Sequence, residues 1–125
     1  MEYLTAMQSI NRAILNPLFY ISFFGALVLL PLNAYLQFHP HSIKFMLLAG
    51  AAALYIIGLF GVTVAGNVPL NNMLDGVDLG SVSADKLAFI RKAFENPWNQ
   101  WHAVRTVAVF LSLVLAVIGS IMSEK

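Results

Sequence analysis

Three long stretches without Asp, Glu, Lys or Arg constrain this chain more than any other feature. They run from Ala13 to Ile43, from Phe45 to Val68 and from Thr106 to Met122. About 20 apolar residues in an α-helix cross the roughly 30 Å hydrocarbon layer of a membrane. Only helices and closed barrels satisfy their backbone in lipid, and the alternation of barrel strands is missing. We therefore predict an all-α integral membrane bundle with three transmembrane helices, over about 17–38, 45–66 and 101–122.

The composition fits a membrane protein and excludes several other classes. Hydrophobic residues make up 59% of the 125 residues and charged residues 10%, against roughly a quarter charged in soluble domains. The lipid bilayer is therefore an expected partner, and the length fits a single membrane domain, 1–125. A net charge of +1 without a basic stripe excludes nucleic-acid binding. With no cysteine, and with two of the three histidines across the membrane from the third, we expect no metal centre.

The N-terminal segment and the distribution of basic residues indicate an orientation. Residues 1–15 read as a short helix leading into the membrane, and Asn16-Pro17 supplies a cap and a first helical turn. The N-terminus and the polar segment 66–105 fall on the same side of the predicted membrane. That side holds Arg12, Lys86, Arg91, Lys92 and Arg105, and the other side holds Lys44 and Lys125. The positive-inside rule then predicts a cytoplasmic N-terminus and a cytoplasmic 66–105 segment.

The polar segment 66–105 contains signals for one more helix. Ser83 is suited to cap a helix over 84–95, and Leu87, Ile90 and Phe94 share one face of it. We expect this short amphipathic helix, between spans two and three, to lie on the bilayer surface or on the end of the bundle. Asn96-Pro97 is then expected to cap and start the helix that continues into span three.

Small residues recur along the second span. Gly50, Gly58, Gly61 and Ala65, with Leu54 completing the spacing, fall on one stripe of an α-helix. Small stripes let helix backbones approach closely in lipid, so we predict a helix-packing face. The alternative is a groove that lines a substrate.

Polar residues that can do chemistry gather where each span meets the cytoplasmic face. An up-down-up topology brings these ends together, and Trp98, His102 and Arg105 share a face of span three. We predict a catalytic set of His102, Arg105, Trp98, Asn67 and Asn71, and a neighbouring polar cluster of Asn11, Arg12 and Asn99 that binds substrate or supports the structure. One titratable imidazole beside fixed cations and amide donors suits removal of an acidic proton and stabilisation of the resulting enolate or phenolate.

Structural explanations for the same residues remain open at this point. Trp98 suits an interfacial anchor, and Arg105 can extend to the membrane surface. Asn67 and Asn71 can tie a turn at Gly66-Asn67-Val68-Pro69, and Arg12 can pair with Asp75 or Glu95.

Three sequence blocks resemble the anthrone oxygenase-like membrane family, a domain of unknown function. They are Met7-Gln8-Ser9-Ile10-Asn11-Arg12-Ala13-Ile14 with Asn16-Pro17, then Gly66-Asn67-Val68-Pro69-Leu70-Asn71, then Trp98 through Arg105-Thr106. The resemblance implies a small helical bundle, usually with four spans, and a place for Asn67, Asn71, Trp98, His102 and Arg105 in the family's polar motifs. It also implies oxidation of anthrones to anthraquinones by O₂ without metal or flavin cofactor. The position of His102 is often Asn in the family.

The resemblance sets the functional expectations. We expect cofactor-independent oxidation of an apolar aromatic small molecule, in a multi-pass protein of a bacterial inner membrane. The alternative is a non-enzymatic bundle that serves as an accessory, transport-related or lipophile-binding subunit. Family members usually have an apolar span before the first block, so we expect a missing first helix, or a partner helix or second copy that replaces it.

Overall fold

The computed structural model describes residues 1–122, and over that range it contains only helices joined by short connections. Helix α1 (Glu2–Ala13) precedes α2 (Pro17–Leu36). The next rod is continuous and comprises α3 (Ile43–Ala53), the π-helical segments η1 (Leu54–Gly61) and η2 (Thr63–Asn67), and α4 (Val68–Asp75). The last helix is α5 (Ala84–Ile121).

Three helices in the described part of the chain, Pro17–Leu36, Ile43–Asp75 and Ala84–Ile121, are long and apolar enough to cross a membrane. The prediction of an all-α membrane bundle with three spanning helices is therefore confirmed. Each of these helices contains most or all of one predicted span.

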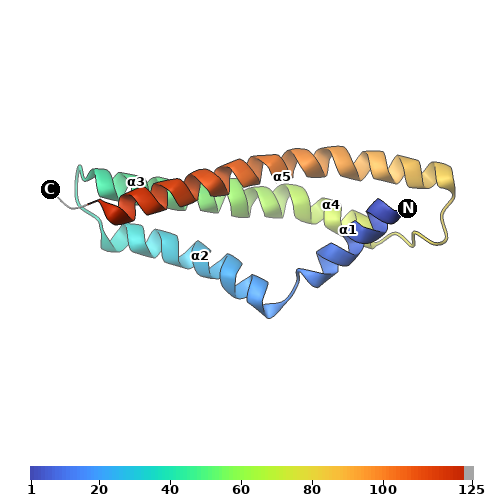
Figure 1. The fold of residues 1–125 in the computed structure, drawn as a ribbon, viewed down its shortest axis with the longest axis horizontal. Coiled ribbons are helices and arrows are strands. Elements are labelled where there is room, and N and C mark those ends of the chain that lie inside the picture. The colour runs from blue at the N-terminus through green and yellow to red at the C-terminus, as the bar shows by residue number, and fades with distance from the viewer. Residues whose placement is uncertain (123–125) are drawn as a thin grey trace.

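Two long rods form the spine of the molecule (Figure 1). Helix α5 runs antiparallel to the rod of α3, η1, η2 and α4 along almost its whole length. Helix α2 packs on α3 at one end of this pair and diverges from it toward residue 17, where the chain turns into α1. The turn follows the predicted signal, because Asn16 Oδ1 accepts a hydrogen bond from the Phe19 amide at 3.0 Å and Pro17 occupies the first turn of α2.

The prediction that Asn96-Pro97 caps and starts a new helix is wrong. Helix α5 continues through Pro97 from its cap at Ser83, whose hydroxyl accepts from the Lys86 amide. A proline inside a helix removes one backbone hydrogen bond. The helix persists because packing holds both sides of the proline, with Phe94 fully buried and the ring of Trp98 stacked on that of Phe94 at 6.1 Å.

The amphipathic segment 84–95 is consequently the first part of α5 rather than a separate helix. Its apolar face joins a compact core at the end of the bundle, formed by Leu4, Leu74, Leu79, Ile90 and Phe94. Helix α1 covers this core, and the ring centroids of Tyr3 and Phe94 lie 6.5 Å apart. The segment therefore lies on the bundle end, which was one of the two expected positions.

Glycines allow the close approach of the two long rods. A Cβ at Gly58 would overlap the Cβ of Ala108, and a Cβ at Gly66 would lie 2.6 Å from the Trp101 indole. A Cβ at Gly50 would lie 3.3 Å from Leu115. The predicted packing face is thus confirmed at Gly50 and Gly58.

The predicted stripe is wrong at Gly61 and Ala65. A Cβ at Gly61 would meet nothing nearer than the carbonyl oxygen of Ile56, at 3.4 Å, and Ala65 is exposed. The reason is the π-helical backbone of η1 and η2, which has more residues per turn than an α-helix. It rotates these two residues away from α5 and brings Gly66 into the contact.

The loop between α2 and α3 offers a local test of backbone strain. His41 has φ of 66°, a left-handed conformation that costs a non-glycine residue about 1–2 kcal/mol. His41→Gly should raise the free energy of unfolding by about 0.5–1 kcal/mol, because part of the relief is offset by the chain entropy of glycine. Thermal unfolding in detergent measures this, and a lower midpoint for the variant would contradict it.

Candidate functional site

A polar cluster lies where η2 and α4 face α5. The indole Nε1 of Trp98 donates to Asn71 Oδ1 at 2.8 Å, and Asn67 Nδ2 donates to the Trp98 carbonyl oxygen at 3.3 Å. Asn67 is only 1% exposed. These two bonds join the antiparallel rods, so Asn67, Asn71 and Trp98 bind each other and hold the helices together.

Arg105 and His102 form the next layer of the cluster. The Arg105 guanidinium donates to His102 Nδ1 through Nε and approaches the same nitrogen through a terminal nitrogen, both at 3.1 Å. It also donates to the Thr63 hydroxyl of η2 at 3.4 Å. Because a guanidinium can only donate, His102 Nδ1 must be an acceptor, which places the proton of the neutral ring on Nε2.

The indole ring of Trp98 packs against both His102 and Arg105. The rings of Trp98 and His102 stack with centroids 4.9 Å apart. The Arg105 guanidinium carbon lies 5.6 Å from the Trp98 ring, within range of a cation–π interaction. The indole therefore fixes the orientation of both His102 and Arg105, and the pair presents N–H donors where an anionic oxygen can be stabilised.

The second predicted group, Asn11, Arg12 and Asn99, does not join this cluster. Arg12 pairs with Asp75 at 2.5 Å, as one of the structural explanations anticipated. The side-chain Nδ2 of Asn11 is buried without a hydrogen-bond partner within residues 1–122. Asn99 is exposed on α5. Arg12 thus fastens α1 to the end of α4.

Gln8, which was not among the predicted site residues, reinforces that fastening. Its side-chain Nε2 donates to the carbonyl oxygens of Leu74 at 2.7 Å and Val77 at 2.9 Å. Both carbonyls belong to the C-terminal end of α4 and the turn after it, where backbone acceptors lack helical partners. Helix α1 therefore caps the bundle beside the polar cluster.

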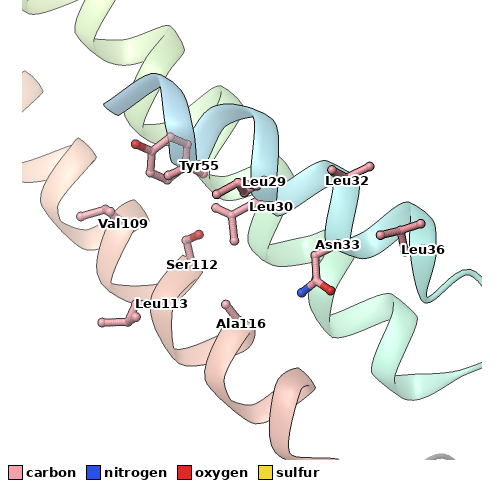
Figure 2. Close-up of a pocket in the computed structure, with 11 residues that line it drawn as sticks. Leu29, Leu30, Leu32, Asn33, Leu36, Tyr55, Val109, Ser112, Leu113 and Ala116 are labelled. Atoms are coloured by element: carbon pink, nitrogen blue, oxygen red, sulfur yellow. The ribbon is translucent and has the colours of Figure 1, made fainter. Parts of the chain in front are cut away.

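An apolar groove separates the C-terminal half of α2 from α5 (Figure 2). Its volume is about 600 Å³, within the range of about 300–1,000 Å³ that is typical of small-molecule sites. The lining residues come from α2 (Ala26, Leu29, Leu30, Leu32, Asn33, Leu36), from η1 (Tyr55) and from α5 (Val109, Ser112, Leu113, Ala116). Figure 2 shows Leu30 and Asn33 on α2 directed toward the side of α5 that carries Ser112 and Ala116.

The groove and the polar cluster share one side of α5. His102, Val109 and Ala116 are spaced by seven residues, which is two helical turns. Val109 also follows Arg105 by a single turn. A ligand in the groove can therefore extend toward the Arg105–His102 pair along a continuous helix face.

Two of the groove residues can be recognised in the sequence by their polarity. Asn33 and Ser112 are polar residues inside uncharged spans, and polar side chains at membrane depth usually face the bundle interior or a cavity. Their positions within the spans predict that they face the interior of the bundle. The sequence does not predict which helices form that interior surface.

These features define a multi-pass helical membrane protein with a polar cluster between its two long rods and an apolar groove farther along α5. The model of the anthrone oxygenase family matches residues 17–115. This range covers most of the chain and includes the second and third blocks of the resemblance, so the chain belongs to the anthrone oxygenase family. Searches of curated proteins and of solved structures find no match.

Proposed function

We propose that this protein oxidises a flat, apolar aromatic ketone of the anthrone type with O₂. The observation that carries the proposal is the Arg105–His102 pair, which lies on the same face of α5 as the groove, with Arg105 one turn before the lining residue Val109. Membership of the anthrone oxygenase family supports the same reaction class. The groove would hold the rings, and the donor pair would meet the ketone oxygen.

The chemistry requires little more than stabilisation of an anion. Loss of a proton from the substrate methylene to water gives an enolate, whose oxygen would accept from Arg105 and from Nε2–H of His102. The enolate carbon then reduces O₂ and binds it as a peroxide, which takes up the proton. The peroxide O–O bond breaks with loss of the second methylene hydrogen, so that one oxygen atom becomes the new carbonyl and the other leaves as water.

The protein would carry out this reaction in a bacterial inner membrane, with the polar cluster near the cytoplasmic face. Five basic residues on the side of the cluster against two on the other support this orientation. An apolar substrate would reach the groove from the bilayer. Within residues 1–122 no group of three or more acidic or histidine side chains is placed to hold a metal ion, and no step above uses one.

Isotope labelling with turnover tests the proposal. The wild-type protein in lipid nanodiscs, supplied with anthrone and heavy-isotope O₂, should form anthraquinone faster than empty nanodiscs. Each new carbonyl should contain one heavy oxygen atom, and one O₂ should be consumed per quinone. A rate equal to that of the empty nanodiscs would reject the proposal.

A second candidate function is a non-enzymatic bundle in which the polar residues only join helices. The bonds of Asn67 and Asn71 with Trp98 favour it, because they join the two long rods without a ligand. This candidate requires that anthrone turnover be absent and that substitutions in the cluster change stability alone.

A further inference from the structure

The groove between α2 and α5 contains three polar side chains, and two of them are already paired. The Tyr55 hydroxyl donates to the carbonyl oxygen of Phe23 at 2.9 Å, and the Ser112 hydroxyl donates to that of Ala51 at 2.7 Å. The third, the carboxamide of Asn33, has no hydrogen-bond partner within residues 1–122. Figure 2 shows this carboxamide directed into the space between α2 and α5.

An unpaired carboxamide in apolar surroundings is unfavourable. Its neighbours in the groove are mainly leucine side chains, among them Leu29, Leu30 and Leu36. Asn33 is half-buried there, and a polar group moved from water into apolar surroundings without a hydrogen bond loses favourable solvation. Such a group in a membrane span usually marks a pathway or a binding site.

We propose that Asn33 donates a hydrogen bond to an oxygen atom of a flat polycyclic ligand bound in this groove. Asn33 then determines specificity by selecting oxygenated ring systems over plain aromatic hydrocarbons. The identity of the ligand as the substrate rests on the proposed function, whereas its binding in the groove does not require turnover.

The dimensions of the groove fit a ligand of this kind. Along α5 the lining extends from Val109 to Ala116, which is about 10 Å at the α-helical rise. That length matches three fused aromatic rings. The two carbonyl oxygens of anthraquinone lie on opposite edges of its central ring, so one of them can face Asn33 on the α2 side of the groove.

Binding of two matched probes tests the role of Asn33. Anthraquinone and anthracene have the same ring skeleton and differ in two carbonyl oxygens, and neither can be oxidised by the proposed reaction. Both should quench the fluorescence of Trp98 and Trp101 in nanodiscs, which gives a Kd for each. The ratio of the two Kd values in the same nanodiscs can be compared between variants, because partition of each probe into lipid is common to all of them.

The expected result is a selective loss of affinity. Asn33→Leu should weaken anthraquinone binding about tenfold, the effect of one hydrogen bond, and leave anthracene binding equal or tighter. Asn72→Leu, the same substitution at an exposed position of α4, should leave both affinities unchanged. Asn33→Gln, which keeps the amide, should retain part of the preference.

Two results would overturn the proposal. One is a Kd ratio that Asn33→Leu leaves unchanged in protein with wild-type thermal stability. The other is no saturable quenching in wild type, as expected if a lipid chain or a helix of a second copy fills the groove. If anthraquinone binds through Asn33 but anthrone is not oxidised, the proposed function fails and this inference stands. If anthrone is oxidised and Asn33→Leu changes no affinity, the inference fails alone.

Discussion

Gly58→Ala should destabilise the protein by about 2 kcal/mol, although alanine is the better helix former. The added Cβ would overlap that of Ala108 on α5, and this atom is fixed to the backbone, so the two rods must separate. The same substitution at Gly25, where an added Cβ would meet nothing within 4 Å, should be neutral or stabilising by up to about 1 kcal/mol. Thermal or denaturant unfolding in detergent measures both.

A compensating substitution identifies the cause. Ala108→Gly removes the atom that a Cβ at position 58 would overlap, so the double variant Gly58→Ala, Ala108→Gly should recover much of the lost stability. The coupling energy between the two positions should then be on the order of 1–2 kcal/mol. Additive effects would show that residues 58 and 108 do not contact each other.

Arg105→Gln should lower anthrone turnover about 100-fold or more. The change removes the charge and the planar set of donors that hold His102 Nδ1 and would face the substrate oxygen. Loss of one donor to a developing oxyanion commonly reduces kcat by about 10²–10³. Arg105→Lys should recover only part of the rate, because an ammonium cannot reproduce the guanidinium geometry.

A second arginine on the same helix provides the control. Arg91 forms an exposed ion pair with Glu95 at 2.6 Å, near the start of α5 and outside the groove. Such surface pairs contribute about 0–1 kcal/mol, so Arg91→Gln should leave turnover per folded protein within about twofold. Rates are normalised to folded protein by size-exclusion chromatography and thermal melting.

The outcome for Arg105 separates the two candidate functions. If the wild type oxidises anthrone and Arg105→Gln matches it per folded molecule, the donor pair is not the reacting site. If the wild type has no activity and Arg105→Gln only lowers the melting temperature, the cluster joins helices and the non-enzymatic candidate is favoured.

Local signals in the sequence predicted the helices well and their ends less well. The spans followed from uncharged length, and the caps at Asn16 and Ser83 followed from side chains that accept from the first turn. Pro97 was interpreted as a helix start, because proline interrupts a helix unless tertiary packing stabilises the residues around it. In the structure, burial of Phe94 and stacking of Trp98 hold the helix together across Pro97.

The polar cluster was predictable in part, because topology brings the ends of spans two and three to the same membrane face. Asn67, Asn71, Trp98, His102 and Arg105 do come together. Arg12 does not join them and pairs with Asp75 instead. Which polar residues pair with each other depends on rotamers and distances of about 3 Å, and a residue pattern does not carry that information.

The residue pattern was enough to predict a helical membrane protein, the meeting of the polar ends of spans two and three, and the resemblance to the anthrone oxygenase family. The three-dimensional arrangement was needed to find the π-helical turns of η1 and η2 and the groove between α2 and α5 that Asn33 lines. The difference arises because burial of apolar length in lipid is a property of each segment alone. Side-chain packing between helices depends on contacts between residues far apart in the chain.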